Sequence, residues 1–573
     1  MNQRTIHTMQ TIQTIRPVWH RRIQLLGVLA IILMAVLGYR LFQKQVLEYA
    51  NFLVLAENQY IVKQDVPATR GNIYFSDTFP AATNQRMYQV VVVPRYIKDK
   101  ETAASALASL LNQTEEDIFN AINSDKYYIP PLKHRLTEEE GQKIADLKIK
   151  GVTVVPESMR VYPEGQLASQ VLGFVDASGD GHYGLEGYYN DQLKGIGGQV
   201  YGEKDTHGNI LDANSSINVR NGSDFTLTLN REVQYQVEQI LTSSVEKYQA
   251  DAGSIIVCDT KTGAILAMAN SPTYNNNDFN KVTDQALFNN AAVTSNWEPG
   301  SVFKPLVMAA AINENKVQPD TENVFPSSVT VNGYEIHTST RKAYGRETMT
   351  QVLENSDNVA MVWVSELLGK ESMSKYLKDF GFGRKTGIEL DNESPGDLAD
   401  VKKWSDVQRA NISFGQGIAT TPLQILMATA AIANDGKLMQ SYIVSKSTDF
   451  TGKENVTQPK VVTQVVTADT AKKVNDMMVS VVVNGHGKKA QIEGYKIAGK
   501  TGTAQVPKPG GGYYEDRHIG SFAGFLPAND PKFAIIVKLD NPKNVDWAES
   551  SAAPTFGEVA KFLLNYMSIP PTS

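Results

Sequence analysis

The sequence predicts an α+β protein with a single N-terminal membrane helix. Three observations carry this prediction: an apolar run at residues 23–39, a mixed region of short strands around a helical insert up to about residue 220, and a remainder in which strands at both ends enclose long helical stretches. A chain of 573 residues is also too long for one ordinary core. We therefore expect four segments, at residues 1–22, 23–42, 43–220 and 221–573.

Composition narrows the class of protein. Hydrophobic residues make up 42% of the chain and charged residues 20%, as in globular proteins. The net charge of −6 comes without a long basic patch, which argues against nucleic acid as a partner. The single cysteine, Cys258, excludes an intramolecular disulfide and a cysteine-rich metal site, and its apolar surroundings predict a buried strand.

The N-terminal run Ile23–Tyr39 has 17 residues, of which only Gln24 is strongly polar. As a helix it would span roughly 26 Å, close to the thickness of a bilayer core. A buried helix and a cleaved signal peptide are the alternatives, but no small-x-small cleavage site follows before Arg40. Residues 1–22 contain four arginines and no acidic residue. We therefore expect a cytoplasmic tail, an uncleaved membrane anchor at 23–42, and everything after Phe42 outside the cytoplasm.

The region from 43 to 220 mixes strand and helix patterns. Helical periodicity continues from the anchor through residues 42–47, and the β-like runs Tyr88–Val93 and Val152–Val155 flank a helical insert near 102–147. Glycines at 195–198 and 221–222 end the region.

The remainder begins with Phe225–Leu229, which alternates like an edge or hairpin strand, and an amphipathic helix at Arg231–Tyr248. Helical stretches dominate to about residue 495. Strand patterns then return at 496–498, 521–525 and 533–537, before a closing helix at Ala552–Tyr566. This order predicts one sheet built from both ends of the domain.

A serine and a lysine three residues apart could be a nucleophile and its base. The pattern occurs at Ser301/Lys304 and three more times, at Ser244/Lys247, Ser339/Lys342 and Ser372/Lys375. The last three lie in polar stretches, and we interpret them as solvated surface. Ser301 differs because Pro305 and an apolar run follow it, which places it near the N-terminus of a buried helix. There Lys304 can reach Ser301, burial should lower the pKa of its amine, and the helix N-terminus favours an oxyanion.

Lys-Thr-Gly also occurs more than once. At 261–263 and 385–387 it has the composition of a turn. At Lys500-Thr501-Gly502, followed by Thr503, it lies among small residues in a strand context, where glycine permits another backbone, such as a peptide substrate, to approach closely. Between the two candidate elements lies Ser356-Asp357-Asn358, which alone would indicate a helix cap or turn.

Ser-x-x-Lys, Ser-x-Asn and Lys-Thr-Gly in this order are the motifs of penicillin-binding proteins and class A β-lactamases. The chain resembles class B penicillin-binding proteins over nearly its whole length, including residues 70–73, 184–186, 299–301 and 415–417. The resemblance implies an elongated pedestal or dimerisation-type domain at 43–220 and a transpeptidase domain, an antiparallel sheet flanked by helices, at 221–573. One departure, Phe75-Ser76-Asp77-Thr78, concerns the pedestal and not the catalytic motifs.

The resemblance also implies residue roles. Ser301 would attack a D-Ala-D-Ala stem peptide, Lys304 would take its proton, and Ser356 would relay a proton to the departing D-alanine. Asn358 would bind the donor peptide, Lys500 and Thr501 would support the electrostatics, and Gly502 and Thr503 would contribute to substrate binding. The backbone N–H groups of Ser301 and Thr503 would form the oxyanion hole. No metal or cofactor is implied, and the implied partners are stem peptides, β-lactams, the membrane, a polytopic membrane glycan polymerase and other cell-wall synthesis proteins.

Other functions stay open at this point. A β-lactamase would need a base for deacylating water, and no Glu-x-x-Leu-Asn lies between Asn358 and Lys500. A D,D-carboxypeptidase usually lacks the anchor and the long pedestal, and a membrane-anchored β-lactam sensor or scaffold would use the serine only as a receptor. Septation and elongation also stay open, with Ser356-Asp357-Asn358 and the chain end soon after the domain favouring septation.

Overall fold

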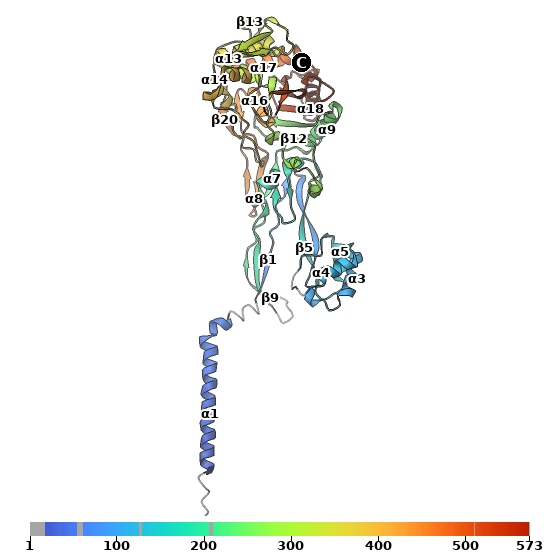
Figure 1. The fold of residues 1–573 in the computed structure, drawn as a ribbon, viewed down its shortest axis with the longest axis vertical. Coiled ribbons are helices and arrows are strands. Elements are labelled where there is room, and N and C mark those ends of the chain that lie inside the picture. Colours follow the sequence, from blue (N-terminus) through green and yellow to red (C-terminus); the bar gives the residue numbers. More distant parts are fainter. Residues whose placement is uncertain are drawn as a thin grey trace, which may run out of the picture. The chain divides into compact units, whose positions relative to one another are not determined.

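The computed structural model describes residues 18–53, 61–124, 126, 129–204, 210–508, 510 and 512–571 (Figure 1). Contacts divide the chain into two compact units, residues 1–67 with 197–219 and residues 68–196 with 220–573. Residues 1–17 of the predicted cytoplasmic tail lie outside the described residues.

The first unit contains the apolar helix α1 (Val18–Phe42), which continues into a π-helical turn, η1 (Gln43–Leu47). Residues 21–47 have a mean hydropathy of 2.3 in their most apolar window, and the side chains of residues 21–42 are exposed. Apolar side chains exposed over this length match a helix that spans a membrane. The unit also holds a three-stranded antiparallel sheet in the order β1 (Ile61–Val66), β8 (Gly198–Lys204), β9 (Ile210–Ile217).

The second unit contains a seven-stranded sheet whose strands come from distant parts of the sequence. The path runs β19 (Glu454–Val456), β18 (Val444–Thr448), β10 (Asp224–Leu227), β2 (Ile73–Tyr74), β3 (Pro80–Val92) and β4 (Lys133–Leu136), and β5 (Val152–Val161) also pairs with β3. The prediction of an edge or hairpin strand at 225–229 is therefore wrong. β10 lies inside the sheet, because β18, about 220 residues later, covers its second edge.

The predicted helical insert folds on this sheet. Helices α3 (Lys100–Leu111), α4 (Glu115–Ile122) and α5 (Glu138–Ala145) bury a small apolar core of their own against β3 and β4. Each helix begins with a side-chain N-cap, from Asp99, Thr114 and Thr137 respectively. Short elements complete this part: η2 (94–96), α6 (169–172), β6 (174–175), β7 (181–182), α7 (184–188) and α8 (190–194).

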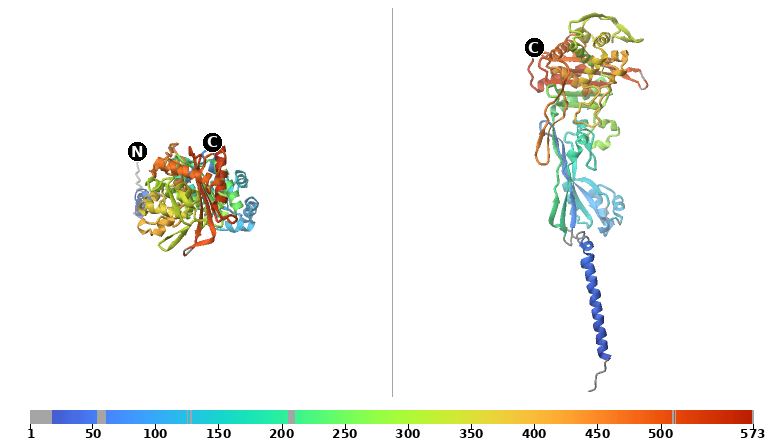
Figure 2. Two further views of the ribbon diagram at one scale, coloured as in Figure 1. Left: turned by 90° about the horizontal axis from the view of Figure 1, so that it is seen from above. Right: turned by 90° about the vertical axis from the view of Figure 1, so that its left-hand side faces the viewer.

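The five-stranded antiparallel sheet is built from both ends of the C-terminal region, as predicted. Its order is β12 (Ile265–Ser271), β11 (Ala252–Asp259), β23 (Phe533–Asp540), β22 (Tyr513–Leu526), β21 (Ala498–Pro507). β21 is an edge strand, and its hairpin with β22 extends beyond β23, as Figure 2 shows in orange-red. The outer edge of β21, which contains the Lys-Thr-Gly segment, is therefore not paired with another strand in the described part of the chain.

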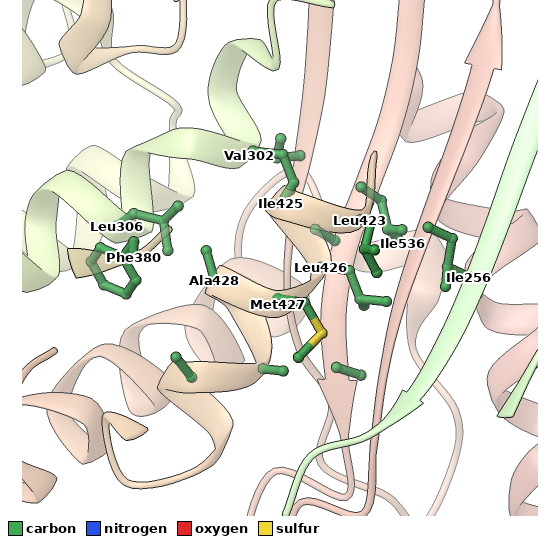
Figure 3. Packing of buried hydrophobic residues seen from close by; sticks show 14 of the residues in the cluster. Ile256, Val302, Leu306, Phe380, Leu423, Ile425, Leu426, Met427, Ala428 and Ile536 are labelled. Carbon is green, nitrogen blue, oxygen red and sulfur yellow. The ribbon is translucent and has the colours of Figure 1, made fainter. Parts of the chain in front are cut away.

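Helices cover both faces of this sheet. Helices α9 (Arg231–Tyr248) and α18 (Ala552–Tyr566) pack on the face that carries Ile255 and Val257. On the other face, which carries Ile256, helix α16 (Pro422–Ala433) is buried along its whole length, between the sheet and α11 (Lys304–Asn313) (Figure 3). The alternation of β11 side chains between two cores explains its uninterrupted apolar run.

Strands also occur where the sequence predicted mainly helix. The hairpins and pairs β13 (322–325) with β16 (345–348), β14 (328–331) with β15 (334–337), and β17 (437–439) with β20 (461–464) are short and partly exposed, so their apolar periodicity is weak. Between them lie α12 (349–354), α13 (358–368), α14 (370–379) and α15 (406–413), and α17 (468–483) follows β20. The remaining turns are η3 (276–281), η4 (285–288), α10 (291–294), η6 (401–403), η7 (488–490) and η8 (548–550).

Candidate active site

Ser301 lies on a single 3₁₀ turn, η5 (Gly300–Phe303), that leads directly into α11. Pro305 occupies the first turn of α11, as its position in the sequence predicts. The Gly300 N–H donates to the Gly415 carbonyl at 2.9 Å, and a Cβ on Gly415 would lie 2.1 Å from the Gly300 carbonyl oxygen. Only glycine permits this contact, so the Gly415 loop fixes the turn that presents Ser301.

Lys304 is fully buried below this turn. Its amine donates to the Ser356 carbonyl at 2.6 Å, to Ser356 Oγ at 3.1 Å and to Asn358 Oδ1 at 2.7 Å. Burial, and secondarily the charge of Lys500, hold its pKa well below the ordinary lysine value. Among the described residues no hydrogen bond joins Lys304 to Ser301, so the amine is oriented by the Ser356 segment in this state.

Ser356 has a left-handed backbone, with φ of 57°. The next residue, Asp357, is the N-cap of α13 and accepts hydrogen bonds from Val359 N at 2.7 Å and Ala360 N at 3.1 Å. The cap that the sequence alone indicates is therefore present, and it belongs to Asp357. Strain at a non-glycine residue next to a cap is typical of functional sites, and here it directs Ser356 Oγ towards two lysines.

Lys500 reaches the same hydroxyl from β21. Its amine donates to Ser356 Oγ at 3.1 Å and to the Thr501 carbonyl at 3.1 Å. Burial lowers the pKa of Lys500 to about 7. Ser356 Oγ therefore lies between two buried amines whose neutral forms burial favours.

Gly502 and Thr503 both make contacts within the protein. A Cβ on Gly502 would lie 2.9 Å from both the Pro299 carbonyl oxygen and Val302 Cγ1. The close approach that this glycine permits is therefore made by the turn that carries Ser301, and a substrate backbone along the edge of β21 stays a prediction. Thr503 Oγ1 accepts a hydrogen bond from Ala548 N at 3.1 Å, which leaves its own O–H free to donate.

These elements surround a cavity of about 300 Å³. Ser301, Ser356, Asn358, Thr501 and Thr503 all line it, whereas Lys304 and Lys500 reach it through Ser356. The sequence analysis missed the other lining side chains, which come from scattered loops: Ser339, Thr340, Phe414, Gln416, His486, Trp547 and Glu549. Gln416 lay in a stretch that the sequence had singled out, and Ser339 had been considered only as a solvated serine.

The serines of the other three Ser-x-x-Lys pairs lie outside the catalytic turn. Two of their positions correct the interpretation made from the sequence. Ser244 is buried and exchanges a hydrogen bond with Thr555 at 2.9 Å, so the expectation of a solvated serine there is wrong. It faces α18 because α9 packs against that helix. Ser339 is exposed as expected, but on the rim of the cavity. Ser372 is half-buried on α14, at a helix start as its sequence suggested.

Two buried carboxyl groups lie next to the site. Glu347 and Asp357 are 2% and 0% exposed, and Glu347 Oε2 and Asp357 Oδ2 accept from no donor in the described part of the chain. Burial and a hydrogen bond to Asp357 raise the pKa of Glu347 to about 7. A proton on Glu347, which its raised pKa favours below about pH 7, would let Glu347 donate to Asp357 and satisfy both oxygens.

The arrangement is suited to acyl transfer. A half-buried hydroxyl sits at the start of a helix, and two amines with lowered pKa share a second hydroxyl beside it. Among the described residues, no three His, Cys, Asp or Glu side chains gather as metal ligands would. The chemistry that these groups can perform is nucleophilic attack with proton transfer through amine and hydroxyl.

Comparison with known families gives two matches. Residues 253–561 match the model of the penicillin binding protein transpeptidase domain, and residues 65–227 match that of the penicillin-binding protein dimerisation domain. The dimerisation match contains β2, β3, β4, β5 and β10 of the seven-stranded sheet. The other two strands of that sheet, β18 and β19, and the five-stranded sheet from Gly253 onward lie in the transpeptidase match.

Curated relatives cover most of the chain. Stage V sporulation protein D of Bacillus subtilis is 34% identical over 559 residues, which is 96% of this chain and 86% of the relative. The peptidoglycan D,D-transpeptidase FtsI of Escherichia coli is 31% identical over 517 residues, 89% of this chain and 85% of the relative.

Solved structures agree with these relatives. A peptidoglycan synthetase from Bifidobacterium adolescentis superposes with a TM-score of 0.74 at 26% identity, covering 90% of this chain and 98% of that one. Penicillin-binding protein 3 from Mycobacterium tuberculosis, complexed with aztreonam, superposes with a TM-score of 0.70 at 28% identity, covering 89% and 98%.

Proposed function

Because this chain belongs to the class B penicillin-binding proteins and is a peptidoglycan D,D-transpeptidase, we propose that Ser301 is the nucleophile that accepts the acyl group of a D-Ala-D-Ala stem peptide. The observation that carries the proposal is the convergence of Lys304 and Lys500 on Ser356 Oγ, in the cavity that Ser301 lines. In the described part of the chain, the amines of Lys304 and Lys500 make no hydrogen bond to Ser244, Ser339 or Ser372.

Acylation then proceeds with neutral Lys304 as the base. Ser301 Oγ attacks the carbonyl of the penultimate D-alanine, and Lys304 takes the hydroxyl proton. The backbone N–H groups of Ser301 and Thr503 stabilise the oxyanion, and the Thr503 O–H binds the terminal carboxylate. When the peptide C–N bond breaks, the proton passes from Lys304 through Ser356 Oγ to the departing D-alanine. Lys500 supports this relay because it donates to the same hydroxyl.

Asn358 completes the donor site. Its Oδ1 accepts from Lys304 at 2.7 Å and its amide donates to the His337 carbonyl at 3.0 Å, which leaves one N–H for the donor peptide backbone. Thr501 and Gly502 hold the edge strand at the level of Ser301, so that an extended donor peptide can lie along β21.

Labelled penicillin tests the assignment of the nucleophile. We expect a stable adduct on the wild-type protein and none on Ser301→Ala, while Ser339→Ala, a serine on the rim of the same cavity, keeps it. An adduct that survives in Ser301→Ala and maps to another serine would refute the proposal. Formation of an amide product from a model ester donor and an amine distinguishes a transpeptidase from a carboxypeptidase, which gives only the acid, and from a sensor, which turns over neither.

We propose further that the chain crosses the membrane once, with residues 1–22 in the cytoplasm and the catalytic region outside. The exposed apolar side chains of α1 and the arginine-rich, acid-free tail support this. A polytopic membrane glycan polymerase is the partner that such an anchor would meet beside the new strands. Protease added to spheroplasts should digest the catalytic region, and full protection of that region would exclude this topology.

A further inference from the structure

One wall of the active-site cavity carries a hydrogen-bonded histidine–glutamate pair that the donor reaction does not use. His486 Nδ1 lies 3.1 Å from Glu549 Oε2, and both residues line the cavity together with Ser301 and Thr503. The side chains are 43% and 35% exposed, so they are open to a molecule that enters from solvent.

Both members of the pair are tied to the catalytic motifs. His486 follows α17, and its N–H donates to the Glu354 carbonyl at 3.4 Å, two residues before Ser356. The neighbouring Gly485 approaches so closely that a Cβ there would lie 2.6 Å from the same Glu354 carbonyl oxygen. The backbone of His486 therefore has little freedom relative to Ser356.

Glu549 is fixed from the other side. It lies on the turn η8, whose first N–H, from Ala548, donates to Thr503 Oγ1 at 3.1 Å. Lys489, close to His486 in sequence, donates to Ser550 Oγ at 3.0 Å and joins the two loops a second time. Glu549 is also near enough to Lys500 for its charge to act on that amine. Contacts to the segments of Ser356 and Thr503 therefore position both members of the pair beside the catalytic motifs.

The chemistry of the second half-reaction calls for such a pair. The acyl group on Ser301 is transferred to a primary amine, which arrives in water as an ammonium ion and cannot attack until it has lost a proton. A carboxylate attracts the ammonium, and an imidazole that this carboxylate orients can take its proton.

We propose that His486 and Glu549 form the binding site for the acceptor amine, so that the acceptor is a cationic primary amine entering over this wall. The inference rests on the proposed function of Ser301. Glu549 binds the ammonium, and His486 takes its first proton. The amine nitrogen then bonds to the acyl carbon while the bond from that carbon to Ser301 Oγ breaks. The second nitrogen proton passes to Ser301 through Lys304, and His486 releases its proton to water.

The test compares two fates of one acyl-enzyme. A thioester donor acylates the protein, and D-alaninamide as acceptor competes with water for the acyl group. In Glu549→Gln we expect the ratio of aminolysis to hydrolysis to fall at least about tenfold, because the ammonium loses its counter-charge. His486→Gln, on a different loop, should lower the ratio in the same direction. Hydroxylamine, which is uncharged near neutral pH, should keep its own ratio to hydrolysis within about twofold in both variants.

Asp546→Asn is the matched control, since it removes an exposed carboxylate from the same loop outside the cavity lining. If Glu549→Gln and His486→Gln keep the wild-type ratio for D-alaninamide, or lose hydroxylamine transfer equally, the pair is only a surface ion pair or a structural support and the inference is overturned. If wild-type protein forms no adduct at Ser301 with labelled penicillin, the proposed function itself fails, and this inference fails with it.

Discussion

The catalytic cavity and the sheet of the N-terminal region both bury cations, but they neutralise them differently. Lys304 and Lys500 are fully buried, and their amines donate to hydroxyl, carbonyl and amide oxygens, none of which is charged. Arg70 and Arg160 are also buried, yet both bind the carboxylate of Glu186, at 2.6 Å and 2.7 Å.

The difference shows that the partner, and not burial alone, decides what a buried cation does. A lysine whose hydrogen-bond partners are all neutral oxygens loses more by dehydration than it gains from carboxylates farther away, so its pKa falls and it becomes a usable base. An arginine keeps its proton at any working pH and, paired with a carboxylate, links distant segments. Arg70 precedes β2, Arg160 lies on β5 and Glu186 on α7, so this cluster joins three parts of the second unit.

The largest expected effect is on the rate of acylation, when the neutral amine at position 304 is removed. Lys304→Arg keeps a positive charge but supplies no neutral amine. We expect acylation by labelled penicillin to slow by about 10²–10⁴-fold, the usual effect of losing a general base. Thermal melting must show a folded protein, because the larger side chain enters a packed helix. A folded variant that acylates within a few-fold of wild type would mean that charge alone suffices.

Breaking the cluster of Arg70, Arg160 and Glu186 should reduce the free energy of unfolding and leave the rate of acylation unchanged. Glu186→Gln removes the shared carboxylate and leaves two buried guanidinium groups without a counter-charge. We expect the free energy of unfolding to fall by about 3–5 kcal/mol, measured by denaturant titration. Asp379→Asn, which breaks the exposed pair with Lys375, should change it by less than about 0.5 kcal/mol. Equal effects of the two variants would show that the buried cluster has no special role.

The pH dependence of acylation tests whether the two buried lysines act in their neutral form. Burial lowers the pKa of Lys500 to about 7, and burial also lowers that of Lys304. Below about pH 7 the Lys500 amine is protonated and can no longer accept a proton, so if a neutral Lys500 is required we expect the acylation rate to fall about tenfold per pH unit below about pH 7. The check is timed penicillin labelling on both sides of neutrality. A flat profile would show that the amines stay charged during acylation.

Lys500 should also make the stability of the protein depend on pH. Its folded pKa is lower than its ordinary value of 10.5, so its contribution to stability is present above that value and is lost as the pH falls towards about 7. Lys500→Met should remove this dependence from the melting temperature.

The smallest expected effect is a change in the pH dependence of the melting temperature, and it comes from the Glu347–Asp357 pair beside the site. The pKa of Glu347 is raised from 4.5 to about 7, so its contribution to stability is complete below about pH 4.5 and is lost as the pH rises through about 7. Glu347→Gln keeps a donor for Asp357 at every pH. We expect this variant to flatten the decline in melting temperature across that window, and an unchanged slope would mean that the two groups do not share a proton.

Much of the fold could be predicted from local patterns. The apolar run at 23–39, the buried strand around Cys258 and the return of strands after residue 496 all follow from side-chain periodicity, which neighbouring residues determine. β10 was misplaced because its second neighbour, β18, lies about 220 residues away, and no local pattern reports a pairing at that distance.

The sequence by itself determined the candidate nucleophile and the order of the motifs, because Pro305 and the apolar run after it restrict Ser301 to the start of a buried helix. Only the tertiary structure decided which groups surround that serine. Ser356, Lys500, His486 and Glu549 come from four separate loops or strands, and their meeting depends on long-range packing. Gly502 illustrates the limit: its sequence indicated close approach, but only the folded chain shows that Pro299 and Val302 are what approach it. A residue's local pattern constrains its own backbone, whereas the identity of its spatial neighbours is set by contacts between segments far apart in sequence.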